Sequence, residues 1–182
     1  MSWKRFKGEL LPQMNSFTFG KDSNKFAKAL TRSYDFTIKS GYSNLTAIPL
    51  IYGNVEGMET TLIQLLQTTK LSSKKTILDV IGPAVIQYWS GASLYLLPPI
   101  IPAPMTLRNI AVTSAPILNA GKWTNIVVPP NSNSEIFLNA FIQSAKLHLT
   151  TVTGAHFCIS QYPPPAAPSP AVLPFTGYYI SE

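Results

Sequence analysis

Residues that could catalyse a reaction or bind a metal are few in this sequence. Outside the predicted N-terminal helices the candidates are Asp79, His148, His156 and Cys158. His156 and Cys158 are two residues apart, which is strand spacing, so their side chains would point the same way, as a metal site or a thiol–imidazole pair requires. A structural metal site usually takes four ligands, and no further Cys or close carboxylate supplies them. We therefore interpret them as a buried thiol and a hydrogen-bonded histidine, and expect no catalytic residue, metal or cofactor.

Two further patterns also have explanations other than catalysis. Glu56 and Glu59 lie three residues apart at the predicted start of a helix, where negative charge is favoured by the helix dipole. Gly121-Lys122 lacks the preceding glycine of a phosphate-binding loop, because Pro116 occupies that position, and no Gly-x-Ser-x-Gly motif occurs. The sequence therefore predicts a protein that is not an enzyme and has no small-molecule substrate.

Charge is distributed unevenly along the 182 residues. Residues 1 to 79 carry eleven of the fourteen Lys and Arg and six of the eight Asp and Glu, which leaves five charged residues from 80 to 182. Soluble monomers normally keep charge spread over their surfaces, whereas the cores of protein interfaces are depleted of it. This pattern predicts that the chain works as one copy in a larger protein assembly, in which neighbouring subunits cover much of its C-terminal half.

The N-terminal charge is mainly basic, and it supports a second hypothesis. A stripe of this kind can contact nucleic acid or another anionic surface, although the solvated faces of amphipathic helices are the interpretation that the sequence favours. The residues proposed for nucleic-acid contact are Lys4, Arg5, Lys7, Lys25, Lys28 and Arg32.

Hydrophobic spacing predicts about five helices. Trp3, Phe6, Leu10 and Met14 recur at helical spacing, and Pro12 is expected to end or kink this first helix. The other helices are expected from Asp22 to Gly41, from an N-cap at Asn54, from about 76 to 90, and from about 133 to 152. In the last of these, Ser132 and Glu135 form a capping-box pattern.

Proline-rich and β-prone segments lie between the last two predicted helices, and a proline-rich segment follows the last one. Residues 96–104 are predicted to be extended, and 109–113 with 123–128 to form a short irregular hairpin. The predicted fold class is therefore mainly α, a small helical domain with a short irregular β-hairpin and extended proline-rich segments. We divide the chain into a helical domain (1–95), an extended segment with short β pieces (96–131), an apolar helix packing on the core (132–161) and a proline-rich C-terminal arm (162–182).

The uncharged span from Val80 to Leu107 is long enough to cross a bilayer, but its five prolines would break a spanning helix. We expect no membrane span, and membrane association stays a third hypothesis. The first residues lack the apolar run of a secretory signal, and the single Cys158 excludes an internal disulfide.

The proline segments and the aromatic end of the arm are the surfaces expected to meet neighbouring subunits. Phe175 to Ile180 could add as a strand to a neighbour's sheet edge. The predicted interface residues are Tyr88, Trp89, Pro98, Pro99, Pro102, Pro104, Phe175, Tyr178, Tyr179 and Ile180.

Several short runs resemble small virion proteins of large tailed bacteriophages. They are Val85-Ile-Gln-Tyr-Trp-Ser-Gly-Ala-Ser-Leu with the following Pro-Pro-Ile-Ile-Pro-Ala-Pro104, the late Phe175-Thr-Gly-Tyr178, the opening Trp3-Lys-Arg-Phe-Lys, and Phe26-Ala-Lys-Ala-Leu with Tyr34-Asp35. The resemblance implies a structural protein of the capsid, neck or tail, located in the virion after assembly in the host cytoplasm. Its implied partners are copies of itself and other virion proteins, and it supplies no catalytic residues.

Overall fold

The computed structural model describes residues 2–16, 22–43, 50–69, 74–90, 92–95, 105–114, 133–160 and 170–182. Within these ranges the fold is mainly helical with five helices, as predicted. The helices are α1 (Trp3–Asn15), α2 (Ser23–Ile38), α3 (Val55–Thr68), α4 (Lys74–Trp89) and α6 (Ser134–Leu149). The strands are β1 (Tyr42–Ser43), β2 (Leu50–Tyr52), β3 (Ser93–Tyr95), β4 (Met105–Ser114), β5 (Thr153–Ser160), β6 (Pro170–Thr176) and β7 (Tyr178–Tyr179).

Helix α1 follows its hydrophobic spacing, and Pro12 does not end it. The Ser2 side chain caps the helix by accepting from the Arg5 backbone N–H at 3.4 Å. Pro12 lies inside the helix and removes the hydrogen bond that the Gly8 carbonyl would accept. Both residues are on the exposed side of α1, where water can hydrogen-bond that carbonyl, so the helix continues to Asn15.

The first residues of two other helices can be compared with the prediction. Asn54 caps α3, as predicted, by accepting from the Gly57 backbone N–H at 2.9 Å. Helix α6 is capped by Asn133, which accepts from the Ile136 N–H at 2.9 Å. The N-cap thus lies one residue after the predicted Ser132, because Asn133 is as good a cap and stands next to the first helical residue. With Asn133 as the cap, Glu135 is one position short of the place that a capping box requires, and Ser132 itself lies outside the described residues.

The strands form two antiparallel sheets. The larger one has the order β2-β3-β4-β5-β6, and the smaller one pairs β1 with β7. In the larger sheet Leu107 lies opposite Cys158, and Cys158 lies opposite Ala171, while β4 shows register shifts on both sides of Ala111. The predicted strand 109–113 lies within β4, which pairs with β3 and β5. The predicted hairpin partner 123–128 and the prolines at 98 to 104 lie outside the described residues.

The core lies at the helical end of the molecule. The four residues that define the first helix are buried in one cluster with the apolar faces of α2, α3, α4 and α6. Phe6 of α1 stacks on Phe141 of α6 with ring centroids 5.4 Å apart, and Tyr34 of α2 meets the same ring edge-on at 6.1 Å. The apolar helix expected at 133–152 therefore packs on the N-terminal helices and shares their core.

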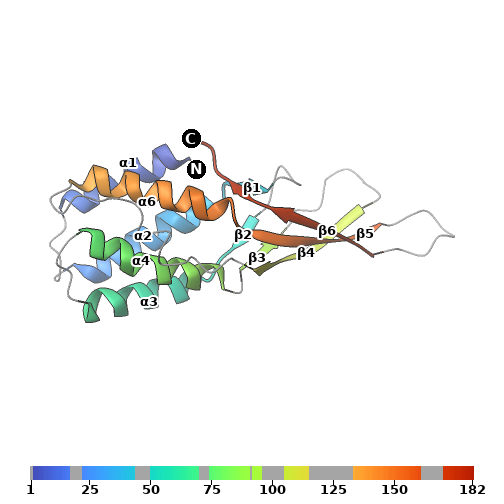
Figure 1. Cartoon of the computed structure of the whole chain (residues 1–182), viewed down its shortest axis with the longest axis horizontal. Helices are drawn as coiled ribbons and strands as arrows, with labels where there is room; N and C mark the ends of the chain where they lie inside the picture. The colour runs from blue at the N-terminus through green and yellow to red at the C-terminus, as the bar shows by residue number, and fades with distance from the viewer. Residues whose placement is uncertain are drawn as a thin grey trace.

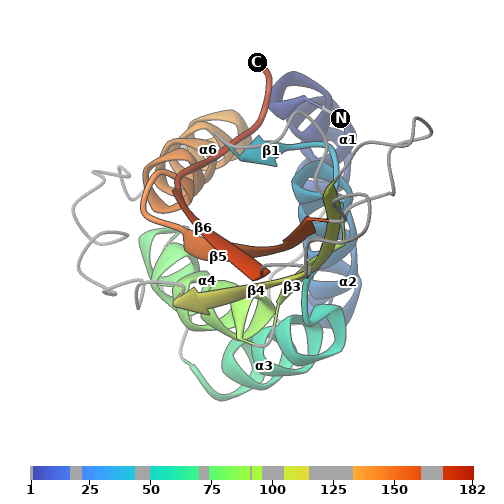
Figure 2. The ribbon, with the colours of Figure 1, turned by 90° about the vertical axis from the view of Figure 1, so that its right-hand side faces the viewer.

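The molecule is elongated (Figure 1). The helices gather at one end, and strands β4, β5 and β6 run away from them at the other. The view along the long axis shows the strands in front of the helices, with the two termini on the same side (Figure 2). The backbone N–H of Trp3 donates to the carbonyl of Ser181 at 3.2 Å, which joins the two ends of the chain.

Candidate functional site

Tyr88 and Trp89, predicted as interface residues, lie inside the helical core. Both are almost fully buried. The Trp89 Nε1–H donates to the Tyr34 hydroxyl oxygen at 3.0 Å, and the Tyr88 hydroxyl donates to Asp35 Oδ1 at 2.9 Å. These side chains therefore satisfy their polar atoms within the subunit and present no surface to a partner.

The carboxylate of Asp35 connects this aromatic cluster to the surface. Its second oxygen accepts from Lys39 Nζ at 2.7 Å. Burial, and secondly the negative charge of Asp35, raise the pKa of the Tyr88 hydroxyl far above its ordinary value. Burial also raises the pKa of Tyr34. These tyrosines are thus neutral hydrogen-bonding groups whose role is to order the core.

The aromatic end of the predicted arm is bound to its own subunit. Tyr178 is buried, and its hydroxyl donates to the carbonyl of Ile38 at 2.5 Å. Strand β7 pairs with β1, with Tyr179 opposite Tyr42, and β6 pairs with β5. Gly177, at φ 90°, makes the turn between β6 and β7, which only glycine adopts without strain. The tip expected to add to a neighbour's sheet instead has partners within the same chain, since β7 pairs with β1 and the Gly177 N–H donates to the Val152 carbonyl at 2.7 Å.

The remaining predicted interface residues divide into two groups. Tyr179 is 42% exposed and Ile180 is partly buried against the core cluster, so among the tip residues whose burial is described, 177 to 180, only Tyr179 is exposed. The backbone of Phe175 lies in β6, opposite Gly154. Pro98, Pro99, Pro102 and Pro104 lie outside the described residues.

The six cations predicted for nucleic-acid contact lie on two sides of α1. One side faces α6: a hollow of about 450 Å³ is lined by Lys4, Lys7 and Lys146 together with Glu182. Lys7 pairs with Glu135 at 2.7 Å and Lys146 pairs with Glu182. Two of the three lysines that line this hollow are therefore paired with a carboxylate.

The other side of α1 faces α2 and is more basic. Two adjoining hollows, of about 240 and 440 Å³, share Arg32 and Ser33. Their charged lining residues are Arg5, Lys25, Lys28 and Arg32 with one acid, Glu9. We call these two hollows the basic groove. It is the strongest candidate for a functional site in the described part of the chain.

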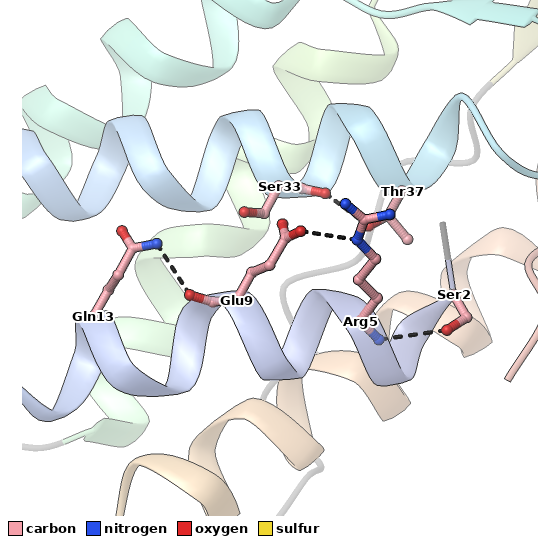
Figure 3. Close-up of polar contacts among 6 residues, drawn as sticks. All are labelled: Ser2, Arg5, Glu9, Gln13, Ser33 and Thr37. Carbon is pink, nitrogen blue, oxygen red and sulfur yellow. Dashed lines mark hydrogen bonds and ion pairs between the residues drawn. The ribbon is translucent and has the colours of Figure 1, made fainter.

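The α1 wall of the basic groove is ordered by short-range contacts (Figure 3). Arg5 Nε donates to Glu9 Oε1 at 3.0 Å, and the Gln13 amide donates to the Glu9 carbonyl at 3.0 Å. Arg5 extends from α1 toward Ser33 and Thr37 of α2 (Figure 3). On the α2 side, the Thr37 hydroxyl donates to the Ser33 carbonyl at 2.7 Å.

Phe36 is the residue of the basic groove that the sequence analysis missed. It lines the smaller hollow and is 57% exposed, the highest exposed fraction among the large apolar side chains whose burial is described. The available signal was its spacing: Phe36 is four residues after Arg32, and Lys25, Lys28 and Arg32 already define that helical face. Phe36 lies on the same helical face as these three cations, and this face points to solvent.

Of Asp79, His148, His156 and Cys158, only His148 has a side chain that the structure describes. Within the described part of the chain, no group of three or more His, Cys, Asp or Glu lies close enough to hold a metal ion. His148 is buried and packs edge-on against Trp89, with ring centroids 5.8 Å apart. His156 and Cys158 lie on β5, as their strand spacing predicted. No described helix is long and apolar enough to cross a membrane.

Comparison with known proteins finds no matching family model, no matching curated protein and no matching solved structure.

Proposed function

We propose that this chain is a non-enzymatic structural subunit of a larger assembly, and that the assembly is a virus particle, as the sequence resemblance implies. One observation carries the proposal: the seven strands contain a single Asp, Glu, Lys or Arg, which is Arg108. The helices hold 15 of the other 21 charged residues. The molecule thus has a charged helical end and a neutral extension of strands (Figure 1).

The neutrality of the strands supports contact with neighbouring subunits. The extension carries almost no charge to keep it in water, and charge depletion is the compositional mark of an interface core. We therefore assign subunit contact to the strands and not to the residues of the aromatic core.

The sheet edges are poorly suited to that contact. Edge strand β2 has three residues, and edge strand β6 contains Pro170 and Pro174, which cannot donate backbone hydrogen bonds. Short edges and edge prolines are the devices by which proteins prevent strand addition. The proposal therefore places the contact on the sheet faces, in contrast to the strand addition expected from the sequence.

The test is self-association of the full chain, measured by sedimentation velocity over a range of concentrations. Thr106→Lys and Leu107→Lys each put one charge into β4. Neighbouring strand positions lie on opposite faces of a sheet, so the pair tests both faces. We expect wild type to form oligomers, and at least one variant to keep its thermal unfolding transition while dissociating into monomers.

The matched control is Gln64→Lys, which adds the same charge at an exposed position of α3 and is expected to associate as wild type does. A wild-type chain that is monomeric at every concentration would contradict the proposal. So would folded variants at both β4 positions that associate as strongly as wild type.

A further inference from the structure

Three cations and an aromatic ring form one line along α2. Lys25, Lys28, Arg32 and Phe36 follow each other at intervals of three, four and four residues, and all four are exposed. Such spacing keeps side chains on one helical face. From Lys25 to Arg32 the line covers about 10 Å of helix axis, which corresponds to about three phosphates of a nucleic-acid strand.

This line forms one wall of the basic groove, and α1 forms the other. Lys25, Lys28 and Arg32 border the larger hollow, and Arg32 and Phe36 border the smaller one. From α1, Arg5 and Gln13 face them across the groove. A ligand in the groove would therefore contact positive charge along its length and an aromatic ring at one end.

The charge on the α2 wall is largely uncompensated. Lys28 and Arg32 have no ion-pair partner among the described residues. Lys25 pairs only with Asp22, at 3.6 Å, and its side chain remains 83% exposed. On α1, by contrast, Arg5 is held by Glu9. The α2 cations are thus the ones available to bind an anionic ligand.

The exposure of Phe36 points to the class of ligand. Tyr34 and Ile38, two residues to either side, are buried in the core, whereas the Phe36 side chain is exposed to water. Sites for single-stranded nucleic acid combine a basic groove that follows the backbone with aromatic side chains on which bases stack. An acidic protein segment would use the cations but has no base to stack on the ring, and duplex DNA keeps its bases stacked on one another.

We infer that the basic groove binds single-stranded nucleic acid, with Lys25, Lys28 and Arg32 contacting phosphates and Phe36 stacking on a base. This function is additional to subunit assembly and does not depend on it, because the groove lies on the helices and the proposed subunit contact lies on the strands.

The test measures binding of the full chain to a fluorescein-labelled oligothymidine by fluorescence anisotropy, over a series of salt concentrations. Three phosphate contacts predict a slope of about −2 for the logarithm of the association constant against the logarithm of salt concentration. A duplex of the same length is measured in parallel, and we expect it to bind more weakly than the single strand.

Two double variants distinguish binding in the basic groove from a general effect of net charge. Lys25→Gln with Lys28→Gln removes two charges from the groove and should reduce the magnitude of the salt slope by about 1.4. Lys4→Gln with Lys146→Gln removes two charges from the hollow on the other side of α1. This control should bind with nearly the wild-type slope, because its lysines do not line the basic groove.

Phe36→Ala tests the stacking contact. It should weaken binding of the single strand by roughly ten-fold without changing the salt slope, since no charge is removed. Phe36→Trp should restore binding, because an indole also stacks on bases. Phe36 is exposed, so both variants are expected to unfold at the wild-type temperature.

Five outcomes would overturn the inference. The first is no binding of the oligothymidine at low salt. The second is an equal loss of affinity in the two double variants, which would indicate a response to net charge alone. The third is full affinity in Phe36→Ala, and the fourth is a duplex bound as tightly as the single strand. The fifth is salt-sensitive self-association that depends on Lys25 and Lys28 while the oligothymidine does not bind, which would assign the groove to an acidic surface of another copy of this chain.

Discussion

The Tyr178 hydroxyl donates a hydrogen bond to the backbone carbonyl of Ile38, at 2.5 Å, and so ties the C-terminal segment to the end of α2. The Tyr178 ring also packs edge-on against Trp89, with centroids 6.2 Å apart. Together with the pairing of β7 and β1, these contacts dock the C-terminal segment on the helical core through the buried Tyr178. The last strand is therefore expected to stabilise the whole fold.

Tyr178→Phe should lower the free energy of unfolding by about 1 kcal/mol, because it removes one hydrogen bond to a buried carbonyl. Tyr178→Ala should cost about 3–5 kcal/mol, since it also leaves a cavity. Urea denaturation measures both. The control Tyr179→Ala, at the neighbouring exposed position, should cost under about 1 kcal/mol. Equal effects at the two positions would contradict the docking of the C-terminus.

Tyr34→Phe should destabilise the fold by about 1–3 kcal/mol, because the buried Nε1–H of Trp89 loses its acceptor. The measurement is a double-mutant cycle with Trp89→Phe, read by urea denaturation. The second substitution removes the donor, so in the double variant the loss of the Tyr34 hydroxyl should cost less than in wild type. Additive effects would show that the hydrogen bond contributes nothing.

Gly53→Ala should destabilise the fold by about 1–3 kcal/mol, because the added Cβ would overlap the buried ring of Tyr88. Gly8→Ala is the matched substitution, since no atom lies within 4 Å of the added Cβ and Gly8 stands inside α1. It should stabilise the fold by about 0.5–1 kcal/mol through helix propensity. Chemical denaturation of the two variants should therefore move the unfolding midpoint in opposite directions.

The fold should lose stability as pH rises above about 10, the ordinary pKa of tyrosine. Burial raises the pKa values of Tyr34, Tyr88 and Tyr178 in the folded state. Above pH 10 the unfolded chain therefore releases protons that the folded chain retains, and alkali favours unfolding. Urea midpoints measured across this range test the sign. Tyr88→Phe should flatten the dependence, and a wild-type midpoint that does not fall would contradict the prediction.

The candidate site was only partly predictable from the sequence. The stripe of cations could be predicted from the sequence alone. The hydrophobic residues of α2 define its buried face, and the cations lie at the positions between them. The sequence could not divide those cations between two sides of α1, because that division depends on α6 packing against α1 from a distant part of the chain. Phe36 was missed because the candidate site was assembled from charged residues alone, although its spacing placed it in line with Lys28 and Arg32.

The sequence determined the helix positions and the Asn54 cap, because both depend on interactions between residues within a few positions of one another. The concentration of charge in the N-terminal half is read from the sequence directly. The tertiary structure alone decided that Tyr88, Trp89 and Tyr178 face inward, that Tyr179 pairs with Tyr42, and that β4 pairs with β5. These contacts join segments far apart in the chain, and local spacing carries no information about which distant partner a strand or an aromatic ring will meet.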